Sequence, residues 1–124
     1  MVKVIDGSAE LEEKQVGKKL LRIKITAEVD GVRSEYTITY GRRGADNATV
    51  GYAAARAGAP DGREADAERL AAVVKAITGK ELKVCQRSDG RIMIECGREH
   101  LDGFARYAEL ADAIERWLEE AGRQ

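Results

Sequence analysis

Residues 20–40 read "LLRIKITAEVDGVRSEYTITY" and decide the fold, because two alternating apolar runs flank the dipeptide Asp30-Gly31. Asp-Gly is typical of a type I′ turn, which joins two antiparallel strands through a two-residue loop. This turn places Val29 opposite Val32, and the pairing continues outward to Leu21 opposite Tyr40. The apolar side chains then share one face of the hairpin and the charged ones share the other. A slip of one residue would mix the faces, so the pattern and the turn predict the same register.

A second hairpin is predicted over residues 82–96. A three-residue loop over residues 88–90 would hold Gly90 in the left-handed conformation. In this register Val84 lies opposite Ile94, and both side chains are expected on the buried face.

Three other segments connect or follow these hairpins. Residues 47–58 fit either a strand or a short helix, and the alternation around Gly51 favours the strand. Apolar side chains at helical spacing predict a helix over residues 63–79 and another over residues 99–122, with a break near Gly103.

The elements follow the order β-β-β-α-β-β-α, after a short strand over residues 2–5 and a charged connection. This order predicts an α+β fold of two layers, a mixed or antiparallel sheet of about 5 strands with two helices on one face. The 124 residues suit a single domain, with residues 1–19 as an N-terminal strand and linker and residues 20–124 as its core. Without a long apolar run or a signal-peptide core, we expect a soluble, cytoplasmic protein.

Charge is spread unevenly along the chain, although the formal net charge is only −1. Residues 18–45 carry seven basic and three acidic side chains, whereas residues 99–122 carry two basic and seven acidic ones. A sheet face that collects basic side chains is typical of proteins that bind a nucleic-acid backbone. The other interpretation is that these are ordinary exposed residues paired with glutamates, as Arg33 would be with Glu28. The candidate nucleic-acid-binding residues are Arg22, Lys24, Arg33, Arg42, Arg43, Lys83, Arg87 and Arg91.

No group of catalytic or metal-ligating residues stands out in the sequence. The predicted hairpin puts Cys85 and Cys96 on opposite faces, and together with His100 they are too few and too scattered to bind zinc. His100 is expected to cap a helix or to lie at the surface. The sequence has no nucleophile elbow, P-loop or dinucleotide-binding glycine motif. We therefore expect no catalytic residue, no metal and no other cofactor.

The last helix has a wider apolar arc than a single stripe requires, because Leu110 and Trp117 lie beside it. Core packing explains most aromatic residues of this kind, but an excess can also mark a contact with another chain. Leu110 and Trp117 are therefore the candidate interface residues.

The second half of the chain resembles a known family. The segments "VVKAITGKELKV" (73–84), "DGRIMIECG" (89–97) and "HLDGFARYAELADAIERWLEE" (100–120) are similar to a paralogous-repeat family of hyperthermophilic archaea, itself similar to LAGLIDADG homing endonuclease domains. The abundance of Lys, Arg and Glu is also typical of thermophile proteins. The resemblance implies a sheet that lies on DNA. Residues 1–19 lack the apolar helix whose acidic end supplies the metal-binding carboxylate of such enzymes, so the resemblance implies a non-catalytic relative or a domain of a longer protein.

The sequence thus predicts a non-catalytic module that binds nucleic acid with the basic outer face of its sheet. The alternative is a structural, protein-interaction or dimerisation module with no nucleic-acid role. The candidate partners are double-stranded DNA and a second copy of the chain, and no membrane partner is expected. A degenerate LAGLIDADG-type nuclease is a third class, supported only by Asp46, Asp61 and Asp89, which are residues typical of turns and caps.

Overall fold

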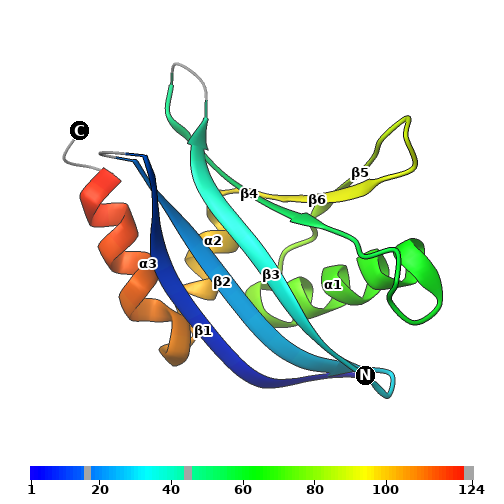
Figure 1. The fold of residues 1–124 in the computed structure, drawn as a ribbon. Helices are drawn as coiled ribbons and strands as arrows, with labels where there is room; N and C mark the ends of the chain where they lie inside the picture. Colours follow the sequence, from blue (N-terminus) through cyan, green and yellow to red (C-terminus); the bar gives the residue numbers. More distant parts are fainter. Residues whose placement is uncertain (16–17, 44–45, 122–124) are drawn as a thin grey trace.

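The computed structural model describes residues 1–15, 18–43 and 46–121. Within these residues it contains one antiparallel sheet of six strands and three helices (Figure 1). The strand order is β1-β2-β3-β4-β6-β5. In chain order the elements are β1 (Val2–Gln15), β2 (Lys18–Val29), β3 (Val32–Arg43), β4 (Ala48–Ala54), α1 (Gly62–Thr78), β5 (Lys83–Gln86), β6 (Ile92–Cys96), α2 (Arg98–Phe104) and α3 (Ala108–Ala121).

The helices cover only one face of the sheet, which we call the helix side (Figure 1). The opposite face, which we call the outer face, carries no helix in the described part of the chain. The predicted α+β class with helices on one face is confirmed, with six strands instead of about five and three helices instead of two. No helix among the described residues is both long and apolar enough to cross a membrane.

The β2–β3 hairpin forms in the predicted register. Val29 pairs with Val32, and the ladder continues to Leu21 opposite Tyr40. The turn residue Asp30 has φ of 48° and is followed by Gly31 with φ of 86°, as a type I′ turn requires. The apolar face of this hairpin forms the centre of the core, where Leu21 and Tyr40 are completely buried.

Strand β1 differs most from the sequence prediction, because it runs through residues 2–15 instead of ending at residue 5. A bulge between Val4 and Asp6 shifts the alternation, so the half-buried positions change from even to odd numbers along the strand. The helix-side residues beyond the bulge are small. A Cβ on Gly7 would lie 3.4 Å from the Leu110 side chain of α3, so the helix packs directly over the strand backbone. A strand with Gly and Ala on its buried side gives little hydrophobic signal in the sequence.

The residues after β3 form strand β4, which settles the choice between strand and helix for residues 47–58. Gly51 is required there, because a Cβ at this position would lie 2.7 Å from the ring of Tyr40. The ring instead lies over the bare backbone of β4, and its hydroxyl donates to the Gly97 carbonyl (3.0 Å).

The β5–β6 hairpin also has the predicted pairing, with Val84 opposite Ile94 and Gly90 at φ of 91°. Its predicted burial is only half right. Ile94 is buried, but Val84, on the edge strand β5, is 51% exposed.

An ion pair between the exposed Arg56 and the buried Asp66 fixes the connection from β4 to α1. Asp66 is 2% exposed and accepts hydrogen bonds from the backbone N–H of Arg56 (2.8 Å) and from its guanidinium (2.8 Å). Burial alone would raise the pKa of Asp66, but the hydrogen bonds and charge of Arg56 outweigh it and hold this pKa below its usual value.

Candidate nucleic-acid interface

The outer face is built from the side chains that alternate with the core residues. On β2 these are Arg22 and Lys24, and on β3 they lie opposite Thr39 and Thr37. Beyond β3, the outer side of β4 presents Tyr52, which pairs with Thr39 and with Glu95 of β6. The face therefore combines basic, hydroxyl and aromatic groups across the neighbouring strands β2, β3 and β4.

Strand β1 brings acidic side chains to the same face, and this changes the predicted patch. Glu10 lies opposite Arg22, and the carboxylate of Glu12 forms an ion pair with Arg22 at 2.7 Å. At the other end of the sheet Arg91 forms an ion pair with Asp89 at 2.8 Å. These two candidate arginines are therefore already neutralised within the chain.

The remaining outer-face candidates have no ion-pair partner within the described residues. Arg33 still lies opposite Glu28 across the hairpin, and Lys83 lies opposite Glu95. The candidates without an ion-pair partner in the described part of the chain are Lys24, Arg33, Arg43, Lys83 and Arg87.

Arg43 lies beside the aromatic group of the face. Its guanidinium carbon is 4.5 Å from the centre of the Tyr52 ring, within the range of a cation–π contact. Tyr52 was not among the predicted site residues. Its place next to Thr39 depends on the register between β3 and β4, which no turn motif in the sequence specifies.

Arg42 does not belong to the outer face, although its neighbour Arg43 does. It follows Tyr40 by two residues and so points to the helix side, where its guanidinium lies 4.4 Å from the Trp117 ring centre and donates to Thr49 Oγ1. Burial, and then the positive charge of Arg98, lower the pKa of Arg42. The two arginines at the end of β3 therefore straddle the sheet instead of forming one basic rim.

The two candidate interface residues are core residues. Leu110 is 0% exposed and Trp117 is 2% exposed in the single chain. The indole Nε1 of Trp117 donates to the Lys19 carbonyl (2.9 Å), and the ring packs against Tyr40 with a centroid distance of 6.3 Å. The wide apolar arc of the last helix serves the fold, since α3 packs against both β1 and β2, so these two side chains do not provide a contact with another chain.

The residues considered for catalysis lie apart and already have structural roles. His100 is buried, accepts the Gly97 N–H at Nδ1 (3.0 Å) and donates from Nε2 to the Glu81 carbonyl (2.7 Å), so it caps helix α2. Cys85 and Cys96 are free thiols on opposite faces of the β5–β6 hairpin. Among the described residues, no three His, Cys, Asp or Glu side chains come together as a metal site would need, so Asp46, Asp61 and Asp89 form no such group.

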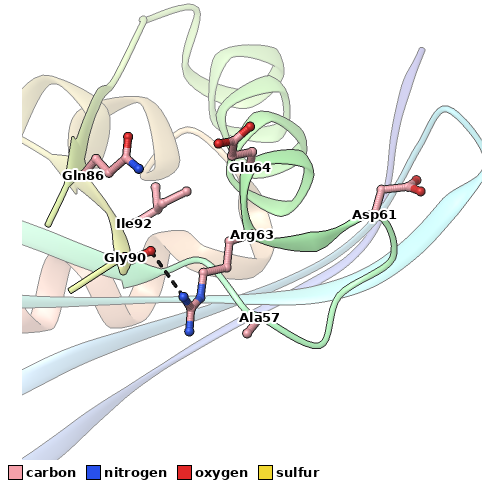
Figure 2. A pocket seen from close by; sticks show the side chains of 7 residues that line it. All are labelled: Ala57, Asp61, Arg63, Glu64, Gln86, Gly90 and Ile92. Carbon is pink, nitrogen blue, oxygen red and sulfur yellow. Dashed lines mark hydrogen bonds between the residues drawn. The ribbon is translucent and has the colours of Figure 1, made fainter. Parts of the chain in front are cut away.

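A hollow of about 440 Å³ lies on the helix side, between the first turn of α1 and the β5–β6 hairpin (Figure 2). Arg63 reaches across it and donates to the Gly90 carbonyl (3.2 Å). Figure 2 shows that Asp61 points away from Arg63 and that Glu64 lies on the helix above. The polar groups of the hollow do not converge on one point.

No family model matches the chain, and neither a curated protein nor a solved structure matches it.

Proposed function

We propose that this protein is a non-catalytic module that binds nucleic acid on the outer face of its sheet. The proposed footprint is centred on Tyr52 and covers the outer side of the strands from β2 to β5, but not that of the edge strand β1. Its contacts with phosphates would come from Lys24, Arg43, Lys83 and Arg87, and its hydroxyl donors from Thr37 and Thr39.

One observation supports this proposal above the others: a six-stranded face that no described helix covers has basic side chains without an ion-pair partner among the described residues, beside a half-buried tyrosine. Lysine and arginine provide the salt-dependent contacts to phosphates, which carry most of the affinity of non-specific binding. An aromatic ring on a sheet also offers a surface on which bases can stack. Acids at β1 limit the footprint, because they would repel a phosphate backbone laid over that edge.

The test is a titration of fluorescently labelled duplex and single-stranded DNA, followed by anisotropy, at about 50 and 200 mM salt. The double variant Lys24→Ala, Arg43→Ala should weaken binding and reduce the salt slope by about 2, because two phosphate contacts are lost. The matched control is Lys80→Ala, Arg116→Ala, which removes the same charge from exposed positions outside the footprint. Equal effects of the two double variants, or no binding at the lower salt concentration, would reject the outer face as the site.

The comparison of the two DNA forms also tests the kind of ligand. If duplex DNA binds more tightly, the face acts mainly through phosphates, and Tyr52→Leu should change affinity little. If single-stranded DNA binds more tightly, stacking contributes, and Tyr52→Leu should cost about 1–3 kcal/mol of binding free energy.

A further inference from the structure

The two edges of the sheet carry opposite charge. Strand β1 forms one edge, and its outer side has the exposed acids Asp6 and Glu10. Strand β5 forms the other edge, and its outer side has the exposed bases Lys83 and Arg87. None of these four side chains has an ion-pair partner among the described residues.

The backbone of β5 is free on its outward side. In an antiparallel ladder, alternate residues direct N–H and C=O groups toward a neighbouring strand, and the residues between direct theirs away. Arg87 N–H donates to the Arg91 carbonyl (2.7 Å), which fixes the phase of this alternation. Val84 and Gln86 therefore direct their backbone groups out of the sheet, where the described chain places no strand.

The same reasoning applies to β1. Asp30 N–H donates to the Met1 carbonyl (3.0 Å), so the ladder between β1 and β2 has a fixed phase. Beyond the bulge, Gly7 and Ala9 direct their backbone groups outward. The contact from Gly7 N–H to the Asp6 carboxylate (2.9 Å) agrees with this direction, because the amide is satisfied by a side chain at the edge and not by a strand.

The strand directions of the two edges also match. In the order β1-β2-β3-β4-β6-β5 every neighbouring pair is antiparallel, so β1 and β5 run in opposite directions. A second copy in the same orientation thus places its β5 antiparallel to β1 of the first copy, with both outer faces on the same side.

We propose that β5 of one copy pairs with β1 of the next copy and extends the sheet head to tail. The outward backbone groups of β1 can bond those of β5 in a register that places Gly7 opposite Gln86 and Ala9 opposite Val84. On the outer face this register puts Asp6 opposite Arg87 and Glu10 opposite Lys83. The exposed Val84 then packs beside Ala9 on the helix side.

Charge disfavours the symmetric alternatives in the corresponding registers. Pairing β5 with its own copy so that Val84 lies opposite Gln86 would put Lys83 opposite Arg87, two like charges directly across the ladder. Pairing β1 with itself would bring its acids together. Like charges suppress these pairings, and opposite charges favour the head-to-tail pairing. Because that contact uses two different edges, repeated association produces open chains or rings rather than a closed dimer.

The test is sedimentation equilibrium without nucleic acid, at low salt, from about 10 µM to about 1 mM, a range suited to a small and weak contact. The weight-average mass should rise with concentration above 13.6 kDa, pass twice that value, and return toward it in 0.5 M salt, which screens exposed charges. Without nucleic acid, Lys83 and Arg87, which the proposed function assigns to phosphates, are available for this contact, so the outcome is independent of the proposed function.

Two charge-reversed proteins provide the decisive comparison. The first carries Lys83→Glu and Arg87→Glu, and the second carries Asp6→Lys and Glu10→Lys. Each alone should stay at 13.6 kDa, because both of its edges now have the same sign, and an equimolar mixture should regain the larger mass. All four side chains are exposed, so circular dichroism should confirm unchanged folds. A wild-type mass of 13.6 kDa throughout, a concentration-dependent mass that the reversals leave unchanged, or a mixture that does not associate would overturn the proposal.

Discussion

Replacing Gly103 with alanine tests how closely helices α1 and α2 approach each other. Gly103 lies in the last turn of α2 and is buried against Thr78 at the end of α1. A Cβ at position 103 would lie 2.6 Å from Thr78 Cβ and 2.8 Å from its Cα. Real Cβ atoms make no contacts under 3.0 Å, and a change of side-chain rotamer cannot move these two atoms.

Two opposing terms decide the sign of the effect. Alanine is favoured over glycine inside a helix by roughly 1 kcal/mol, so an exposed site would gain stability. Here α1 and α2 must instead move apart, which opens the packing around the completely buried Leu101 and Phe104. Overpacking of this kind costs about 1–3 kcal/mol and more where the backbone must shift, so we expect a net loss of about 2 kcal/mol.

Urea unfolding followed by circular dichroism measures this loss. The control is Gly58→Ala, because a Cβ at Gly58 meets no atom within 4 Å. This control should leave stability unchanged or raise it by up to about 1 kcal/mol, since alanine reduces the freedom of the unfolded chain. If Gly103→Ala matched the control or stabilised the protein, the close contact between α1 and α2 would be refuted.

Three other predictions follow from buried groups. Asp66→Asn should lower the free energy of unfolding at pH 7 by about 2 kcal/mol, less than for a fully buried pair because the Arg56 side chain is 46% exposed. In urea titrations, the difference between variant and wild type should fade as pH falls from about 5, through the unfolded pKa of about 3.9, toward the lower pKa of the folded state. Trp117→Ala should lower the free energy of unfolding by about 3–5 kcal/mol, and a loss below about 1 kcal/mol would contradict its burial. Burial raises the pKa of Cys96 to about 12, so Ellman's reagent at pH 8 should modify Cys85 alone until urea exposes both thiols.

The local sequence pattern predicts much of this fold, because the turn and the alternation within a hairpin together specify which residues pair. The Asp30-Gly31 turn and the alternation beside it specify the β2–β3 hairpin completely, and every predicted pair occurs. Strand β1 was underestimated because its bulge interrupts the alternation and because Gly7 and Ala9 are small where α3 packs closely. A sequence window reveals neither the bulge nor the helix that makes small residues necessary.

The predicted site changed for the same reason, since the charge of a surface depends on which strands become neighbours. The basic segment over residues 18–45 and the acidic residues of β1 have opposite charge and are neighbours in the sheet, so Glu12 neutralises Arg22. Alternation also sends Arg42 to the helix side, away from Arg43, although the two are consecutive in the chain.

The prediction of Leu110 and Trp117 as interface residues has a related cause. The apolar arc of α3 shows how much surface the helix buries, but it does not show which element covers that surface. The apolar arc packs against β1 and β2, where β1 is longer than the sequence indicated, and both Trp117 and Leu110 are buried in that contact.

The surface that the described chain leaves exposed on the sheet is instead polar, with one open face and two edges of opposite charge. Contacts that depend on exposed charges weaken as salt rises, whereas an apolar helix contact would persist. Salt dependence is therefore the property that both proposals require of this molecule, and a salt-insensitive partner would point to a surface that neither of them uses.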